Sequence, residues 1–395
     1  MPQPYSPQED SLMLSEQVKK HAKGVILDVG TGRGIQVLSA LENKLSKKII
    51  GIDIDKESVD YCRKKIKSKK ADFFQSDLFD IFKRKKLLPK EFFSCQFDTI
   101  IFNPPYLPAE NPKDIDIQLE GGKKGYEVIE RFLSEANEFL SQDGIILLLF
   151  SSRTNKEYID NLIQKSLFIS EILDKKHFFF EDLFVYKISK SEILKEIESN
   201  GISKIKFLAK GHHGLVYLGV YRGRKTAIKI KNPKSHAINT IAKEAYWLEK
   251  LEKYKIAPKL IISSGNFLAM EFVEGDLILD YIRKSGKKET IELLNKIFEQ
   301  LIILDKLGIK KEEMHHPIKH IIIRRGNPVL IDFERAHYTE KQSNVTQFYS
   351  FLMRITALLA VKGIEIDKDS VMEACREYRK TGRISMDFFA SNHPA

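Results

Sequence analysis

A glycine-rich turn between an apolar run and a periodic apolar segment constrains the fold of this chain more than any other stretch. Residues Val25–Val29 are typical of a buried strand, and residues 35–45 repeat apolar positions with a helical period. Between them lie Gly30, Gly32 and Gly34, whose lack of a side chain lets the backbone approach a ligand closely. Strand, glycine turn and helix in this order favour a nucleotide-binding α/β fold with a parallel sheet.

Three acidic residues lie at the expected ends of successive strands, where ligands bind in open α/β sheets. Asp28 ends the first strand and suits a cationic or amino-acid cofactor better than a pyrophosphate. Asp53 follows the apolar run at 48–52, about twenty residues beyond the glycines, where an acid can accept from both ribose hydroxyls. A third strand is expected to begin at Phe73 and to end at Asp77, which can accept from an adenine amino group.

The sequence Asn-Pro-Pro-Tyr at 103–106 follows Phe97–Phe102, an apolar run that predicts a fourth strand. Two prolines cannot extend that strand because they lack backbone donors, so Asn103 is expected at its carboxyl end. The carboxamide of Asn103 offers one acceptor and two donor hydrogens, which suits a planar amide or an exocyclic amine. The ring of Tyr106 can lie against a flat substrate, and residues 107–125 predict a substrate loop over the site.

These motifs together resemble the S-adenosylmethionine-dependent class I methyltransferases, and most closely the HemK family of protein-glutamine N5-methyltransferases. The opening residues 5–11, Tyr-Ser-Pro-Gln-Glu-Asp-Ser, resemble the short archaeal and eukaryotic branch of that family. The resemblance covers about residues 3–190 and implies a set of ligand contacts. By resemblance, the methionine moiety is held by Asp28, Gly30, Gly32 and Gly34, the ribose by Asp53, the adenine by Asp77, and the substrate amide by Asn103 and Pro104.

The resemblance also implies an acceptor and a partner. The family methylates the glutamine of the Gly-Gly-Gln loop in class I translation release factors, often with a small zinc-binding activator subunit. The same four-residue motif occurs in adenine-N6 methyltransferases that act on RNA or DNA, so both acceptors remain open. In either case Asn103, Pro104 and Tyr106 are the expected catalytic residues, because alignment rather than a strong base supplies most of the rate gain.

Charge and cysteine usage indicate where such a protein works. Residues 1–200 hold 31 Lys+Arg against 32 Asp+Glu, whereas residues 201–395 hold 34 against 22. The basic second half favours an anionic partner such as a nucleotide, RNA or the ribosome, with a solvated lysine-rich surface as the alternative. The three cysteines have no metal-ligand spacing, the first residues are polar, and no apolar run could span a membrane. We therefore expect a cytoplasmic protein without a membrane partner.

From residue 202 the pattern changes to short strands with a second set of nucleotide-binding signals. Residues 207–218 fit a GxGxxGxV loop that contains Gly211 and Gly214, with alanine in place of the first glycine. Lys229 ends an Ala-Ile-Lys strand where it would face phosphates, and Glu244 on the next helix can pair with it. The stretch resembles the small atypical protein kinases of the RIO and KEOPS type, which implies ATP with Mg²⁺ as ligands.

The expected catalytic loop of that kinase-like domain departs from the family pattern. Asp332, followed by Phe and Glu, fits the metal-binding position. In one alignment His320 replaces the second metal ligand and His315 replaces the base; in the other, Glu313 is the base. We favour Glu313 because a carboxylate can accept a proton. An active kinase or ATPase and a nucleotide-binding pseudokinase scaffold both remain open.

These patterns divide the chain into four parts. We expect a methyltransferase domain at 1–189, a helical linker at 190–201, an atypical kinase-like domain at 202–388 and a tail at 389–395. The expected architecture is a class I, Rossmann-like α/β sheet followed by an α+β bilobal kinase-like domain. The corresponding function is a bifunctional protein of translation termination.

Overall fold

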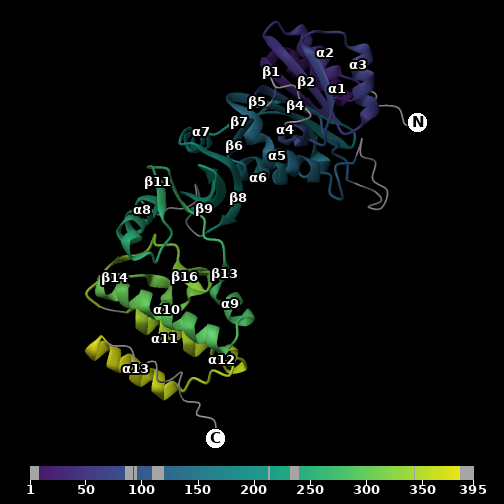
Figure 1. The fold of residues 1–395 in the computed structure, drawn as a ribbon. Coiled ribbons are helices and arrows are strands. Elements are labelled where there is room, and N and C mark those ends of the chain that lie inside the picture. Colours follow the sequence, from purple (N-terminus) through teal and green to yellow (C-terminus); the bar gives the residue numbers. More distant parts are fainter. Residues whose placement is uncertain are drawn as a thin grey trace. The chain divides into compact units, whose positions relative to one another are not determined.

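The computed structural model describes residues 9–84, 92, 96–108, 120–211, 214–231, 240–341 and 343–382 (Figure 1). The chain forms two compact units, the first comprising residues 1–207 with 219–222 and the second comprising 208–218 with 223–395. Three predicted features lie outside the described residues: the start of the opening motif at 5–8, most of the expected substrate loop, and the tail at 389–395.

A seven-stranded sheet forms the first unit. Its order is β3 (Ala71–Gln75), β2 (Ser46–Asp53), β1 (Gly24–Val29), β4 (Phe97–Phe102), β5 (Leu140–Ser151), β7 (Glu181–Lys190) and β6 (Phe168–Phe178). The strands β1 to β5 pair in parallel, and β7 is antiparallel to both β5 and β6. The strand order reverses between β1 and β4, which is the switch point where open α/β sheets bind their ligands.

Helices cover both faces of this sheet, which explains why its central strands are apolar throughout. The helices of the unit are α1 (Glu9–His21), α2 (Ile35–Glu42), α3 (Lys56–Lys65), α4 (Asp80–Lys83), α5 (Glu127–Phe139), α6 (Lys156–Lys165) and α7 (Glu192–Ser199). Leu14, Val37 and Val59 place α1, α2 and α3 in one buried cluster with alternate residues of the strands. On the other face, Phe132 of α5 lies 4.6 Å from Phe102 between ring centroids.

Two predicted elements end earlier than expected. The third strand ends at Gln75 rather than at Asp77, because Ser76 Oγ donates to the carbonyl of Leu78 and turns the chain, with Leu78 at a φ of +44°. The lysine-rich segment at 57–70, which the sequence predicts to be one helix, is helical only as far as Lys65, since Ile66 is already extended. Asp77 therefore lies in a turn beyond the strand, from which it still reaches the edge of the sheet.

The segment expected to link the domains is part of the first unit. Helix α7 begins after Ser191, whose side chain accepts from the backbone N–H of Leu194 at 3.4 Å. Its apolar side chains Leu194 and Ile197 are fully buried, and Lys190 Nζ lies 2.7 Å from a carboxylate oxygen of Glu198. This compact unit extends to residue 207.

The second unit combines a small sheet with a group of helices. In sheet order, this unit contributes β11 (Leu260–Ser263), β12 (Phe267–Glu271), β10 (Arg224–Lys231), residues 214–218 of β9 (Gly214–Tyr221) and residues 208–210 of β8 (Ile202–Lys210), and α8 (Thr240–Leu251) accompanies them. Short strands follow at β13 (Asp276–Leu277), β14 (Ile309–Lys310), β15 (Ile321–Arg324), β16 (Asn327–Leu330) and β17 (His337–Tyr338). The remaining helices are α9 (Ile278–Lys284), α10 (Lys287–Lys306), α11 (Asn344–Arg354), α12 (Thr356–Val361) and α13 (Lys368–Thr381).

One buried polar cluster fixes the helices of the second unit. Asp305 at the end of α10 accepts from the side-chain amide of Asn344 at 2.7 Å and from the hydroxyl of Tyr378 at 2.9 Å. It thereby joins α10 to α11 and α13, next to an apolar core that includes Phe298 and Phe348. Among the described residues no helix is both long enough and apolar enough to cross a bilayer.

Candidate active site

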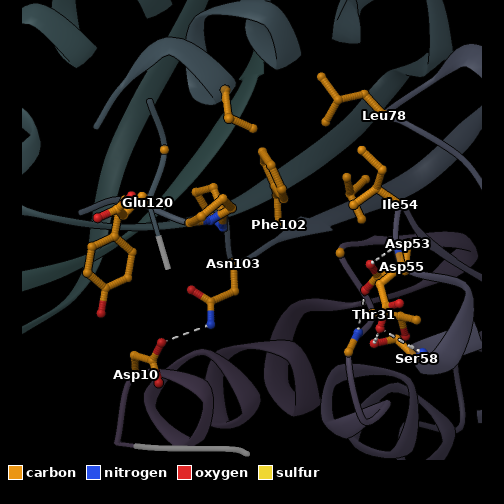
Figure 2. Close-up of a pocket in the computed structure, with 18 of the residues that line it drawn as sticks. Asp10, Thr31, Asp53, Ile54, Asp55, Ser58, Leu78, Phe102, Asn103 and Glu120 are labelled. Carbon is orange, nitrogen blue, oxygen red and sulfur yellow. Dashed lines mark hydrogen bonds between the residues drawn. The ribbon is translucent and has the colours of Figure 1, made fainter. Parts of the chain in front are cut away.

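A cavity of about 510 Å³ opens at the carboxyl ends of β1, β2 and β4. Figure 2 shows Asn103 on one side of it and Asp53, Asp55 and Ser58 on the other. The lining includes these of the predicted site residues: Gly30, Gly32, Asp53, Asp77, Asn103, Pro104 and Tyr106. Strands that are far apart in sequence thus bring most of the expected residues to one space.

The glycine turn has two functions that its pattern did not separate. All three glycines have left-handed backbones, with φ of +67° at Gly30, +50° at Gly32 and +79° at Gly34. A Cβ atom on Gly32 would meet nothing within 4 Å, so the backbone there is open to a ligand. A Cβ atom on Gly34 would lie 2.4 Å from the side chain of Ile66, so Gly34 permits the turn to pack on the chain after α3. Gly34 does not line the cavity.

Asp28 lies beneath the turn and is also absent from the cavity lining. It is 1% exposed, and it accepts a hydrogen bond from Thr31 Oγ1 at 2.7 Å. Burial raises the pKa of Asp28 to about 7, against the smaller opposing effect of that hydrogen bond. Asp28 therefore supports the backbone of the turn through Thr31, and its expected contact with a cofactor stays a prediction.

Asp53 is held by the backbone on both of its oxygens. Its Oδ2 accepts from the N–H of Gly32 at 2.8 Å, and its Oδ1 accepts from the N–H of Asp55 at 2.9 Å. Burial raises the pKa of Asp53, and these backbone donors oppose that shift. Asp55 caps α3 by accepting from the N–H of Glu57 and of Ser58. The carboxylate of Asp53 is thus fixed in place at the edge of the cavity.

Asp77 is paired with a cation that sequence reasoning did not identify. Its Oδ2 lies 2.7 Å from Nη2 of Arg131, which comes from α5 on the far side of the cavity mouth. Both side chains are more than a third exposed, so the pair contributes little stability and serves mainly to orient the carboxylate. The only available signal was an arginine in the first half of a predicted helix, which is too common to single out.

Asn103 is oriented by the first turn of α1. Its Nδ2 donates to Asp10 Oδ2 at 3.0 Å and lies 3.5 Å from Ser11 Oγ. Figure 2 shows this contact and the carboxamide oxygen turned away from it. That oxygen is buried and has no hydrogen-bond partner within the part of the chain that the structure describes. The result is a fixed acceptor at the end of β4.

Residues 120–125 pack against the end of the Asn-Pro-Pro-Tyr stretch and the residue that follows it. Leu107 and Glu120 form a bridge, and the N–H of Gly121 donates to the carbonyl of Leu107 at 2.9 Å. A Cβ atom on Gly121 would lie 2.4 Å from the carbonyl oxygen of Pro105, so only glycine fits. The sequence showed a glycine-rich loop here but gave no indication that it contacts residues 105–107.

Several lining residues were not predicted as site residues: Asp10, Ser11, Gln36, Arg131, Arg153 and Glu181. Gln36 on α2 is 4% exposed, and its Nε2 donates to the backbone carbonyl of Ser11 at 3.0 Å. Its Oε1 is buried without a hydrogen-bond partner among the described residues, as is Oδ1 of Asn103. Asp10 and Ser11 belong to the opening motif, which was noted only as a family likeness.

In the second unit, Lys229 gathers three carboxylates. Its Nζ lies 2.7 Å from Glu244 and 2.8 Å from both Asp332 and Glu334. Burial lowers the pKa of Lys229, but the carboxylates outweigh burial and the net shift is upward. Oxygen atoms of the three acids lie within 4.8 Å of one another, a spacing that can hold a metal ion. Glu334 was not among the predicted site residues, because the family pattern has glycine at that position.

The two predicted loop glycines lie beside this lysine. The N–H of Gly211 donates to the carbonyl of Gly214 at 2.8 Å and closes the turn, whose residues 212 and 213 lie outside the described chain. A Cβ atom on Gly214 would lie 2.9 Å from Cε of Lys229. The glycine therefore leaves room for the lysine stem.

A second lysine separates the expected base from Asp332. Lys311 is fully buried, and its Nζ donates to the backbone carbonyl of Asp332 and lies 3.3 Å from Glu313 Oε2. His320 Nδ1 lies 3.8 Å from Asp332 Oδ2, so both Glu313 and His320 are near the Lys229 cluster. His315 instead contacts the carbonyl of Glu312 at 3.1 Å. Burial lowers the pKa of Lys311 and of His320.

The comparisons with known proteins concern the first unit. Residues 8–179 match the family profile described as "Methyltransferase small domain". A "Putative protein N5-glutamine methyltransferase" of Methanocaldococcus jannaschii is 33% identical over 190 residues, which cover 47% of this chain and 90% of that protein. A release factor glutamine methyltransferase of Streptococcus pneumoniae is 24% identical over 159 residues, covering 38% of this chain and 52% of that enzyme.

A third relative is the "eRF1 methyltransferase catalytic subunit" of Schizosaccharomyces pombe, which is 34% identical over 86 residues, covering 20% of this chain and 37% of that protein. The match with the Streptococcus enzyme spans about half of that enzyme's length. The match with the Methanocaldococcus protein spans nearly the whole of it, at an identity above 30%. Through its first unit, this chain therefore belongs to the S-adenosylmethionine-dependent protein N5-glutamine methyltransferase family.

Proposed function

We propose that the first unit transfers a methyl group to the side-chain amide of the glutamine in the Gly-Gly-Gln loop of a class I translation release factor. The observation that supports this most is the carboxamide oxygen of Asn103, buried at the cavity with no hydrogen-bond partner among the described residues. Such an acceptor suits the N–H of a planar amide. The relatives from Streptococcus and Schizosaccharomyces have names that refer to release factors.

The residues of the cavity fit S-adenosylmethionine. The space beside Gly32 admits a ligand against the backbone, and the two orphaned oxygens of Gln36 and Asn103 call for N–H donors. We assign Asp53 to the ribose and Asp77 to the adenine. Gly30, Gly32 and Gly34 form the turn over the methionine moiety, with Asp28 supporting it through Thr31. When bound, the cofactor supplies an electrophilic methyl group.

The chain's own residues supply alignment. Asn103 Oδ1 accepts an N–H of the target amide and fixes its nitrogen, while Pro104 and Tyr106 shape the wall on which the amide plane lies. The nitrogen–carbon bond forms as the sulfur–carbon bond breaks, and the nitrogen then loses a proton to water. Holding the two reacting atoms in line accounts for most of the rate gain in such a reaction.

Two exposed aromatic side chains near the cavity offer a contact surface for the acceptor. Phe179 and Phe180 form the turn between β6 and β7 and are 89% and 83% exposed. The next residue, Glu181, lines the cavity, so the two rings lie near its mouth. Aromatic side chains anchor protein interfaces and also stack on unpaired bases, so this surface suits either acceptor, and the names of the relatives are what favour the protein. Adenine-N6 methylation of RNA or DNA remains the second candidate, since an exocyclic amine also donates to Asn103.

Radioactive methyl transfer separates these two acceptors. The full-length chain is incubated with labelled S-adenosylmethionine and a release factor carrying Gln or Ala in its Gly-Gly-Gln loop, and separately with tRNA and an adenine-containing DNA. We expect label on the Gln protein alone. Because the Schizosaccharomyces relative is named a catalytic subunit, each reaction is repeated with a small zinc-binding subunit as the proposed activator. Label on nucleic acid but not on the Gln protein would overturn the proposed acceptor.

For the second unit we propose binding of ATP with Mg²⁺. The contacts of Lys229 with Glu244 and Asp332 support this, since a lysine–glutamate pair beside a metal-binding aspartate is the arrangement that positions ATP in protein kinases. His320 is the proposed second metal ligand and Glu313 the proposed base. Gly211 and Gly214 are proposed to cover the phosphates. The basic surplus of this half would add contacts to RNA or the ribosome.

Turnover of labelled ATP with Mg²⁺ tests this proposal and separates an enzyme from a scaffold. Asp332→Ala should abolish both phosphate release and binding of ATP with Mg²⁺ in an active kinase or ATPase. In a pseudokinase scaffold, ATP binding persists in the wild type without turnover that depends on Asp332. A wild-type chain that binds no ATP would overturn both.

A further inference from the structure

We infer that the first turn of α1 is the positioning element of the methyl-transfer site, in an argument that rests on the proposed function. This turn accepts one hydrogen bond from Asn103 and one from Gln36. These two bonds determine which end of each carboxamide faces the cavity. The two ends of a carboxamide have nearly the same shape, but one donates and the other accepts. The hydrogen-bond partner at one end of the carboxamide therefore determines whether the other end presents a donor or an acceptor to the ligand.

Asp10 determines the orientation of Asn103. A carboxylate oxygen accepts hydrogen bonds, so the amino end of Asn103 must face Asp10 Oδ2, which it does at 3.0 Å. Asp10 is 5% exposed, and its Oδ1 accepts from the backbone N–H of Ser11 at 2.6 Å, so the carboxylate is itself fixed. A reversed carboxamide would set oxygen against oxygen. The acceptor end of Asn103 is thereby turned to the substrate side, as Figure 2 shows.

The neighbouring backbone carbonyl determines the orientation of Gln36. The carbonyl of Ser11 can only accept, and it receives Nε2 of Gln36 at 3.0 Å. Gln36 Oε1 is consequently left buried without a partner in the described chain, next to the same cavity. One turn of helix thus presents two acceptor oxygens. We assign Asn103 Oδ1 to an N–H of the target amide and Gln36 Oε1 to the α-ammonium group of the cofactor.

The two assignments predict different kinetic consequences. Without the Asp10 contact, Asn103 stays in place but its carboxamide is free to reverse. The reversed carboxamide presents its amino group to the N–H of the target amide, which needs an acceptor. That error affects the reacting nitrogen and not the cofactor, so Asp10 acts through Asn103 as a positioning residue. Loss of the Gln36 amide removes a partner of the cofactor and leaves the reacting nitrogen aligned.

The test uses the full-length chain with Asp10→Asn, Asn103→Asp and the double variant that combines them. Asp10→Asn should lower kcat about 10–100-fold and change the Kd of S-adenosylmethionine less than about 3-fold. Asn103→Asp brings two carboxylates together and should lower kcat further. In the double variant the amide at position 10 donates to the carboxylate at position 103, and kcat should rise about 10-fold above that of Asn103→Asp. A residue with only a structural role would not show this rescue.

Gln36→Leu is the matched comparison, because it keeps the volume and removes both ends of the amide. It should raise the Kd of S-adenosylmethionine about 10-fold and leave kcat at saturation within about 3-fold. A double variant no better than Asn103→Asp, or an Asp10→Asn variant that loses cofactor binding as much as turnover, would overturn the inference. If the wild type methylates nucleic acid instead of the release factor, the proposed acceptor fails, and the same variants are assayed on the nucleic acid.

Discussion

The cavity of the first unit and the Lys229 cluster of the second are both buried and polar, and both contain groups with shifted pKa values. They differ in how many of their polar atoms have a hydrogen-bond or charge partner. In the cavity, Asn103 and Gln36 each have one oxygen without a partner among the described residues. In the cluster, Lys229 contacts Glu244, Asp332 and Glu334 directly, while the buried Nδ1 of His320, 3.8 Å from Asp332, also lacks a hydrogen-bond partner among the described residues. Shifted pKa values occur in both places, so a shift by itself does not distinguish a site that awaits a ligand.

An unpartnered acceptor that also lines a cavity distinguishes it better, because other buried atoms such as Oδ1 of Asn137 lack a partner among the described residues without lining this cavity. A buried oxygen without a donor costs about 1–3 kcal/mol, and a ligand with an N–H group removes that cost. A cluster whose charges already neutralise one another gains less from a ligand and loses more when one member is removed. The first unit should therefore respond to mutation mainly in its chemistry, and the second mainly in its stability.

The largest effect is expected for Asn103→Ala. Without the acceptor oxygen the target nitrogen is no longer aligned, and kcat should fall at least about 10³-fold. The Kd of S-adenosylmethionine, measured by calorimetry, should change less than about 3-fold, because the other cofactor contacts remain. Asn161→Ala on the exposed side of α6 serves as the control. Equal losses of turnover and of cofactor binding would contradict the division of roles between Asn103 and the rest of the cavity.

Lys229→Met should be the strongest change in the second unit. It leaves the buried carboxylates of Glu244 and Glu334 and the partly exposed one of Asp332 without their cation, and the free energy of unfolding of that unit should fall by about 3–5 kcal/mol. Urea unfolding of the full chain measures the effect, with cofactor binding by the first unit expected to persist. Lys231→Met on the same strand, at an exposed position, should change stability by less than about 0.5 kcal/mol. A stable Lys229→Met protein would show that the cluster is not held by charge pairing.

An intermediate effect is expected for Asp28→Asn, and it depends on pH. The pKa of Asp28 is about 7 in the folded chain and near 3.8 when solvated, so the folded state binds more protons between these values. The free energy of unfolding should therefore fall as pH rises from about 4 to 7, and stay level above 7. Asn keeps an acceptor for Thr31 and removes the titration. The variant should be about 1–3 kcal/mol more stable than wild type at pH 8 and show a flatter profile; an unchanged slope would argue against a buried charge at Asp28.

The smallest effect is expected for Glu334→Gln. Lys229 keeps Glu244 and Asp332, so one carboxylate can be neutralised at a cost of less than about 1 kcal/mol, or with a gain. Thermal unfolding measured beside Glu244→Gln gives the matched comparison, because Glu244 is fully buried and also accepts from the backbone N–H of Phe333 at 3.4 Å. Should Glu334→Gln prove the more damaging of the two, Glu334 would be the main counter-ion of Lys229.

The predictable part of the site comes from local patterns. The strand before Gly30, the position of Asp53 after β2, and the end of β4 at Asn103 follow from apolar runs and from what glycine and proline permit. Asp28 lies at the predicted strand end, but its full burial beneath the turn did not follow from the pattern. Side chains alternate between the two faces of a strand, and the pattern did not show on which side of the turn this one would lie.

The remaining contacts join residues that local patterns cannot connect. Asp10 and Asn103 are 93 positions apart, and Asp77 and Arg131 are 54 apart. Each pair forms because the strand order brings separate strand ends to one edge, and that order was not deducible from periodicity. Glu334 was missed for another reason. The kinase pattern has a glycine at this position, so it predicted a functional role only for the nearby Asp332.

The first unit extends past α7, and this extension limits where its polypeptide can be truncated. Ile202 and Ile205 are buried, and the side chain of Asn137 donates to the carbonyl of Ile205 at 2.9 Å. A fragment ending at residue 189 would lose these groups together with the buried face of α7, and would expose apolar surface. Expression of the methyltransferase half alone should therefore retain at least residue 207 to keep these buried groups covered.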